Sequence, residues 1–132
     1  MKAQSNLNRC FLMSYQLFLD DVRERTSIYP DTDFQTRLEW VTVRSFVSFQ
    51  ETILLKGIPN FVSFDHDLAP EHYANPTSHQ VTKTGYDCAL WLCDYCVRQG
   101  ESLPVWKVHS MNPVGKRRIE ALLESISHSH IK

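Results

Sequence analysis

Acidic residues directly follow two short apolar runs of the chain: Asp20 and Asp21 follow residues 15–19, and Asp65 follows residues 61–64. Carboxylates that converge in one place repel one another and resist ionisation unless a counter-charge lies between them. A hard divalent cation supplies that charge, and oxygen ligands with water favour Mg²⁺ or Mn²⁺. We therefore predict a metal site formed by Asp20, Asp21 and Asp65, with loop solvation or helix capping as the alternative role.

Two histidines stand at the same kind of position. His66 lies between Asp65 and Asp67, and His109 directly follows the apolar run 105–108. An imidazole changes charge near neutral pH, so each histidine could transfer protons, or could be a hydrogen-bonded structural residue. We predict that His109 and His66 are the catalytic acid and base, and that Asp67 orients a histidine or a metal-bound water.

A third group of polar residues is suited to bind an anion. Asn112 precedes Pro113, which is typical of a helix start, and helix N-termini offer free N–H groups and positive potential. Asn112 is also an ordinary N-cap. The predicted phosphate- or substrate-binding residues are Ser110, Asn112, Lys83, Thr84 and Arg23.

The elements that would position these residues alternate between strands and helices. Such alternation implies a parallel sheet with right-handed crossovers, in which ligands bind beyond the carboxyl ends of the strands where the strand order reverses. The three polar clusters therefore meet in one crevice. The predicted strands are 15–19, 40–44, 61–64 and 105–108. The predicted helices run from Ser45 to Gly57, from Thr84 to Gly100 and from Asn112 to Ile126. We expect loops at 22–37, with at most a short helix, and at 68–82, and a frayed tail at 127–132.

Length and composition limit the class of protein. The 132 residues, 42% of them hydrophobic, fit one domain, which we place at residues 13–132 after an N-terminal extension of residues 1–12. The net charge of -1 and the lack of a basic block argue against binding to nucleic acid by charge alone. No apolar run approaches the roughly 18 residues of a membrane span, and no signal peptide is evident. We expect a cytoplasmic protein without a membrane partner.

The four cysteines do not form the pattern of a secreted disulfide framework, because three of them fall in one predicted helix. The pair Cys93 and Cys96 has the spacing of a metal or redox motif, but it lies within an amphipathic helix among apolar neighbours. We interpret these residues as small buried thiols and expect no disulfide-linked partner.

Residues 17–21 and 61–65 together resemble a response-regulator receiver domain. That resemblance matches Asp20 and Asp21 to the metal-binding pair, Asp65 to the phosphoacceptor and Ser110 to the hydroxyl position. It implies an α/β, flavodoxin-like open parallel sheet. The receiver's lysine ends a fifth strand that is not predicted here, so we expect about four strands in the order 2-1-3-4, a truncated form of the receiver fold.

A more specific resemblance is to the cyclic-phosphate-processing receiver-like family of phages and bacteria. It rests on Leu-Asp-Asp-x-Arg at 19–23, Ser-Phe-Asp-His-Asp-Leu at 63–68, Thr-Gly-Tyr-Asp at 84–87 and His-Ser-x-Asn-Pro-x-Gly at 109–115. The resemblance implies metal-dependent phosphoesterase action on a cyclic nucleotide, an RNA 2′,3′-cyclic phosphate end or ADP-ribose cyclic phosphate. The alternatives are a non-catalytic binder of a cyclic nucleotide and a signalling receiver phosphorylated on Asp65.

Overall fold

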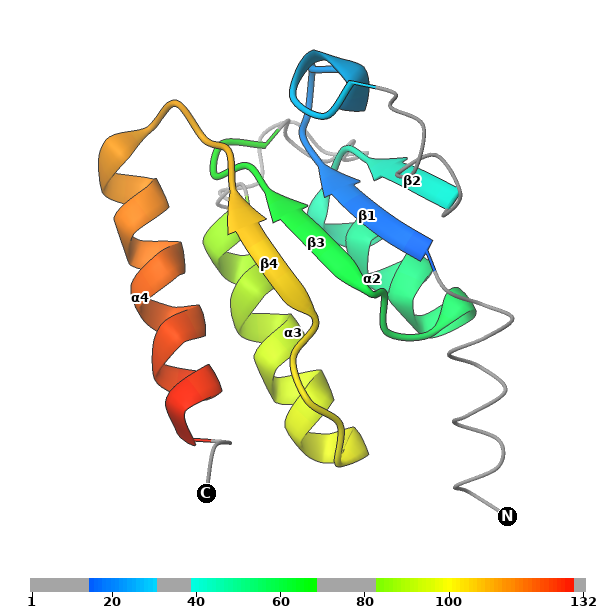
Figure 1. Ribbon diagram of the computed structural model, residues 1–132, viewed down its shortest axis with the longest axis vertical. Coiled ribbons are helices and arrows are strands. Elements are labelled where there is room, and N and C mark those ends of the chain that lie inside the picture. Colours follow the sequence, from blue (N-terminus) through cyan, green and yellow to red (C-terminus); the bar gives the residue numbers. More distant parts are fainter. Residues whose placement is uncertain (1–14, 31–38, 69–82, 130–132) are drawn as a thin grey trace, which may run out of the picture.

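The computed structural model describes residues 15–30, 39–68 and 83–129, which form one parallel sheet and three α-helices. The order of the strands across the sheet is β2-β1-β3-β4, with every pair parallel (Figure 1), so the predicted open sheet of order 2-1-3-4 is confirmed. The elements along the chain are β1 (Tyr15–Leu19), the 3-10 helix η1 (Arg25–Ser27), β2 (Glu39–Val43), α2 (Phe46–Lys56), β3 (Phe61–Phe64), α3 (Gly85–Gln99), β4 (Val105–Val108) and α4 (Pro113–Ser129).

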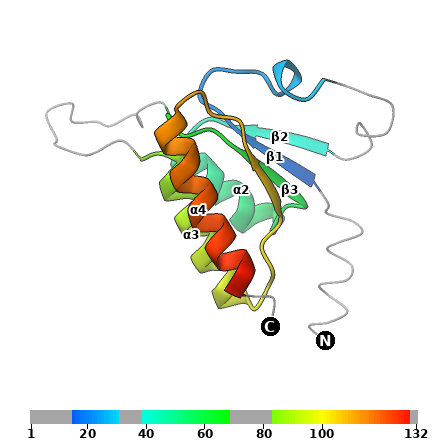
Figure 2. The same ribbon diagram turned by 60° about the vertical axis from the view of Figure 1, so that its left-hand side comes forward.

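The three α-helices lie together on one side of the sheet, and the η1 segment lies on the other (Figure 2). Handedness explains this distribution. The crossovers through α2 and α3 advance in the same direction across the sheet, and right-handed crossovers that do so place their helices on one face. The connection from β1 to β2 advances the opposite way, so it belongs on the opposite face.

The main core lies between the sheet and the helices. Successive side chains of a strand alternate between its two faces. Leu17, Leu19, Val62 and Phe64 face the helices and are fully buried there. The residues that alternate with them therefore project from the face without α-helices, and this is the face that carries the polar residues after the strand ends.

Each helix begins at a residue that the sequence indicates. Ser45 and Thr84 form capping boxes at the starts of α2 and α3, and the Asn112 side chain accepts a hydrogen bond from the Gly115 amide in α4. Gly100 ends α3 in the left-handed region, with φ of 68°.

Three details concern the predicted boundaries and loops. The second strand starts one residue earlier than predicted, at Glu39, and it ends before Arg44. The last helix extends to Ser129, so the prediction of a frayed tail from Ser127 is wrong for its first three residues, since no proline or glycine interrupts the helix there. Within 22–30, only the short η1 forms, as predicted. The proposed extension 1–12 and most of the loop 68–82 lie outside the described residues.

The cysteines of α3 are part of the core. Cys93 and Cys96 are buried free thiols, and Cys88 lies fully buried beside them. Burial raises the pKa of Cys93 to about 11 and that of Cys96 to about 12, so both are held as neutral thiols. Among the described residues, no helix is long and apolar enough to cross a membrane.

The two faces of α2 provide a test of this packing. Ile53 is fully buried against the sheet, whereas Leu55, two residues away, is 84% exposed. Ile53→Ala should lower the free energy of unfolding by about 2–5 kcal/mol, because it leaves a cavity in the core. Leu55→Ala on the same helix should change it by less than about 0.5 kcal/mol. Urea denaturation of both variants measures the difference, and equal effects would contradict the packing described here.

Candidate functional site

Asp20, Asp65 and His109 each continue a strand by one residue. Backbone hydrogen bonds hold them in the ladder: the Asp20 amide donates to Val43 at 3.1 Å, the Asp65 amide to Leu19 at 3.0 Å and the His109 amide to Phe64 at 2.9 Å. All three side chains project on the helix-free face, at the point where the strand order reverses between β1 and β3. One ligand atom from each lies within 4.8 Å of the others, which is compatible with a shared cation.

Asp20 is a carboxylate with no exposed surface. Its Oδ1 accepts the amides of Val22 at 2.9 Å and Arg23 at 2.8 Å, and its Oδ2 lies 2.9 Å from His109 Nε2. Burial by itself would raise the pKa of Asp20, but these hydrogen bonds outweigh burial and lower it overall. Asp20 is therefore ionised at neutral pH although it is buried.

Asp65 has the opposite tendency. Burial and the nearby charges of Asp20 and Asp21 raise its pKa, and the hydrogen bond that its Oδ1 accepts from the His66 amide at 2.8 Å offsets this only in part. Two carboxylates in such proximity, one of them reluctant to ionise, favour a cation between them. The oxygen donors match the preference of a hard divalent ion, so the residues present fit Mg²⁺ or Mn²⁺.

His109 is enclosed on the same face. Its side chain is 4% exposed, and its ring stacks on Phe18 with centroids 4.6 Å apart and planes 7° from parallel. Its Nδ1 lies 2.6 Å from Ser63 Oγ, which lies 2.8 Å from the Tyr29 hydroxyl. Burial lowers the pKa of His109 despite the neighbouring Asp20 charge, so the imidazole is neutral at neutral pH.

A second cluster forms where the loop after β3 meets the start of α4. His66 Nδ1 lies 2.9 Å from Asp67 Oδ1, and the side-chain nitrogen Nδ2 of Asn112 lies 3.4 Å from each of these two atoms. The Asp67 carboxylate can only accept, so Nδ1 donates to it, and the 3.4 Å approach of the Asn112 side-chain nitrogen to Nδ1 is not a hydrogen bond. Nε2 of His66 has no hydrogen-bond partner among the described residues. With the ring proton on Nδ1, the lone pair of Nε2 can accept a proton.

Two glycines allow this loop to approach the helices. A Cβ on Gly115 would lie 2.3 Å from the His66 ring, and a Cβ on Gly85 would lie 1.7 Å from the Asp65 carbonyl oxygen. The Gly85 amide donates to the His66 carbonyl at 2.7 Å. The glycines of the two helix starts therefore set the position of Asp65 and His66, because any larger residue would displace them.

The remaining predicted site residues are placed differently. Asp21 is half-buried and acts on Asp65 through its charge, but it is not one of the three residues whose ligand atoms converge. Arg23 Nε lies 4.0 Å from Asp20 Oδ2. The Ser110 hydroxyl accepts a hydrogen bond from the backbone N–H of Asn112 at 3.0 Å.

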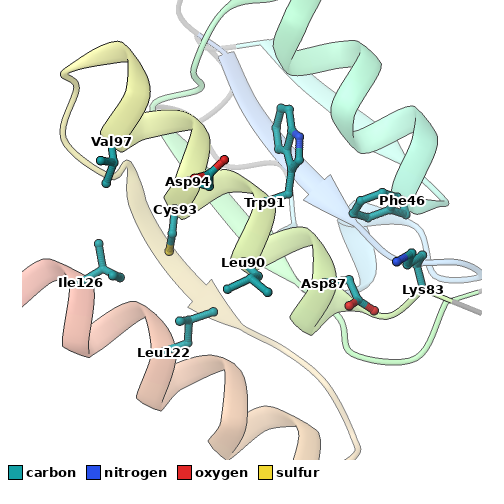
Figure 3. A pocket seen from close by; sticks show the side chains of 10 residues that line it. All are labelled: Phe46, Lys83, Asp87, Leu90, Trp91, Cys93, Asp94, Val97, Leu122 and Ile126. Atoms are coloured by element: carbon teal, nitrogen blue, oxygen red, sulfur yellow. The ribbon is translucent and has the colours of Figure 1, made fainter.

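Lys83 and Thr84 lie at the start of α3. The Thr84 hydroxyl is engaged with Asp87 in the helix cap. The Lys83 amine lies 5.6 Å from the centre of the Phe46 ring and borders a largely apolar pocket over α3 that also contains Trp91 and Leu122 (Figure 3). None of the clustered carboxylates and histidines lines this pocket.

Three residues of the site were missed by the sequence analysis. Arg44, directly after β2, donates to the carbonyls of Asp20 at 3.3 Å and Arg23 at 2.8 Å and pairs with Glu24 at 2.9 Å, so it holds the acidic loop. Ser63 is fully buried, and a polar residue inside the apolar run of β3 was a detectable signal. Tyr29 offered no such signal.

No curated protein and no solved structure gives a significant match. The family model of the cyclic-phosphate processing receiver domain matches residues 15–125, a range that contains all four strands and both polar clusters. The chain therefore belongs to the cyclic-phosphate processing receiver family.

Proposed function

We propose that this protein hydrolyses a cyclic phosphate with the help of a divalent cation held by Asp20 and Asp65. The observation that carries the proposal is the convergence of Asp20, Asp65 and His109 within 4.8 Å at the carboxyl ends of the strands. The family model, whose description names cyclic-phosphate processing, supports the same chemistry.

The carboxylates would hold the cation from one side of the crevice. Asp20 retains lone pairs beside its three hydrogen bonds, and among the described residues the Asp65 side chain accepts a single hydrogen bond, from the His66 amide. Asp21 adds negative charge close by. A bound Mg²⁺ or Mn²⁺ would neutralise charge on the phosphoryl oxygens. Two aspartates leave most of an octahedral shell to water and ligand oxygens, as Mg²⁺ usually requires.

His66 is the better placed of the two histidines to move a proton. With Nδ1 donating to Asp67, its Nε2 can take a proton from the attacking water as the new P–O bond forms. The ring P–O bond then breaks, and the protonated His66 can return that proton to the leaving alkoxide, giving a phosphomonoester. Both nitrogens of His109 already have partners within the protein, so we assign it a supporting role.

The phosphate group would lie at the start of α4. The Ser110 hydroxyl can still donate a hydrogen bond, and the first amides of α4 add positive potential. Arg23, one-third exposed, adds a cation beside Asp20. Lys83 and Thr84 have other partners, so they contribute least to the proposed ligand set.

The ligand's identity, the choice between Mg²⁺ and Mn²⁺ and the cytoplasmic location stay predictions.

Cation binding can be tested through stability. Because a ligand that binds only the folded state stabilises it, Mg²⁺ at about 100 times its Kd should raise the free energy of unfolding of the wild type by about 2.7 kcal/mol. Asp65→Asn should lose most of this gain, while the control Asp94→Asn, an exposed acid on α3 paired with Arg98, should keep it. Differential scanning fluorimetry with Mg²⁺, Mn²⁺ and EDTA compares the resulting shifts in melting temperature among the three proteins. Equal gains in all three proteins would remove Asp65 from the site.

The raised pKa of Asp65 predicts a pH effect in the protein without cation. A carboxyl group whose pKa is higher folded than unfolded binds its proton more tightly in the folded state. The wild type should therefore lose stability as pH rises from about 3.8, the ordinary value, through the raised pKa of Asp65. The pKa of Asp20 is lowered, so Asp20 affects stability below pH 3.8, where its contribution to the free energy of unfolding is lost as pH falls.

Asp65→Asn removes the first of these effects. In EDTA, the variant should be more stable than the wild type near pH 7, and the difference should shrink as the pH approaches 4. Urea denaturation of both proteins from pH 4 to 8 measures it, and saturating Mg²⁺ should reverse the order at pH 7. A difference that does not vary with pH would show that Asp65 has no raised pKa.

The assignment of His66 predicts a kinetic effect. After a screen of cyclic nucleotides, RNA 2′,3′-cyclic ends and ADP-ribose cyclic phosphate with Mg²⁺ or Mn²⁺, His66→Gln should lower kcat by roughly 10²–10⁴-fold. KM should change little, because proton transfer contributes little to binding of the ground state. Asp67→Asn should have a smaller effect in the same direction, since it only orients the ring. Ligand that the wild type binds but returns intact would indicate a binder and not an enzyme.

A further inference from the structure

Four polar side chains form a continuous chain of hydrogen bonds on the helix-free face of the sheet. The Tyr29 hydroxyl lies 2.8 Å from Ser63 Oγ, Ser63 Oγ lies 2.6 Å from His109 Nδ1, and His109 Nε2 lies 2.9 Å from Asp20 Oδ2. Ser63 and Asp20 have no exposed surface, and the His109 side chain is 4% exposed. Three strands and the segment after η1 thus contribute to one buried network.

The proton positions in this network follow from its acceptor end. The Asp20 carboxylate accepts two backbone amides at Oδ1 and the imidazole at Oδ2, so His109 Nε2 carries the proton of that last hydrogen bond. With the ring proton on Nε2, the lone pair of Nδ1 faces Ser63 Oγ, which can donate its hydroxyl proton to it. The Ser63 oxygen in turn accepts the proton of Tyr29. Every group is satisfied, and all of the hydrogen bonds run in one direction, from Tyr29 to Asp20.

The network restrains His109 in each way that its ring could move. The stack on Phe18 fixes the plane of the ring, and the two hydrogen bonds at opposite nitrogens fix its rotation within that plane. Tyr29 is itself held by the Trp40 ring, 5.3 Å away and 23° from parallel, and by the edge of Phe61 at 5.7 Å. An aromatic cluster thus sets the hydroxyl that begins the chain.

We propose that Ser63 and Tyr29 are positioning residues, which act through His109 to hold the Asp20 carboxylate in the orientation that a divalent cation requires. The proposal rests on the proposed function for the cation, but the state of His109 can be measured without one. Partners of this kind behind a metal ligand usually contribute 10–100-fold in metal affinity.

The test compares Ser63→Ala, Tyr29→Phe and the control Tyr15→Phe. Tyr15 also has a buried hydroxyl with a hydrogen bond, to the Gly57 carbonyl, but it lies at the other end of β1 on the helix side. By calorimetry with Mg²⁺, Ser63→Ala should lose about 10–100-fold in affinity. Tyr29→Phe should lose less, because Ser63 can still donate to His109. Tyr15→Phe should keep wild-type affinity even if it is less stable.

The second readout is the imidazole of His109, observed by ¹⁵N NMR in the protein without cation. The wild type should show a proton on Nε2 and a hydrogen-bonded Nδ1. Ser63→Ala should move the Nδ1 resonance towards that of an unbonded nitrogen, and Ser63→Thr, which keeps the hydroxyl, should restore it. A merely structural role for Ser63 would change the melting temperature without this signature.

The outcomes separate the two proposals. If the wild type binds no Mg²⁺ or Mn²⁺ but His109 responds as expected, the proposed function fails while the network stands. A proton on Nδ1 of wild-type His109, or Ser63→Ala with unchanged affinity and an unchanged Nδ1 signal, would overturn the positioning role. If Ser63→Ala does not fold, Tyr29→Phe decides by the same two measurements, since it keeps the aromatic ring and its contacts.

Discussion

The buried charge of Asp20 is the constraint on which the carboxyl end of the sheet depends. An ionised carboxylate without exposed surface persists only where hydrogen bonds replace the water that it has lost. Two amides of the following turn and the imidazole of His109 supply them. Arg44 holds the same turn from β2 through the carbonyls of Asp20 and Arg23. The conformation after β1 is therefore determined by the need to keep one charge satisfied.

The distribution of helices decides what can surround that charge. Because α2, α3 and α4 all lie on one face, the other face depends on the β1–β2 connection for its cover in the described structure (Figure 2). Tyr29 packs there against Phe18 and Phe61, and Ser63 of β3 and His109 after β4 contact Tyr29 and Phe18 respectively. A buried polar network is stable only when every member is satisfied, and in this network Ser63 meets that condition through His109 and Tyr29.

Close approach of backbones joins the second cluster to the first. Gly85 contacts the Asp65 carbonyl, and Gly115 contacts the His66 ring, so the starts of α3 and α4 press on the loop after β3 from two directions. The loop places Asp65 beside Asp20 and turns His66 towards Asp67 and Asn112. The loop thus connects a site suited to a cation with a histidine suited to proton transfer. The glycines are needed because a Cβ on Gly85 or Gly115 would collide with the loop and displace Asp65 or His66.

The sequence by itself indicated the parallel sheet, the helix starts and the three polar clusters, since alternating patterns, capping residues and apolar runs ending in acid are local signals. The strand order was predicted from the resemblance to a receiver domain. It also indicated Asp20, Asp65 and His109 as neighbours, because the carboxyl ends of parallel strands share one edge. Only the tertiary structure decided that both nitrogens of His109 are occupied and that Lys83 lies over Phe46. The roles of Ser63, Tyr29 and Arg44 arise from contacts between residues 20 or more positions apart, and such contacts depend on side-chain packing that no local pattern encodes.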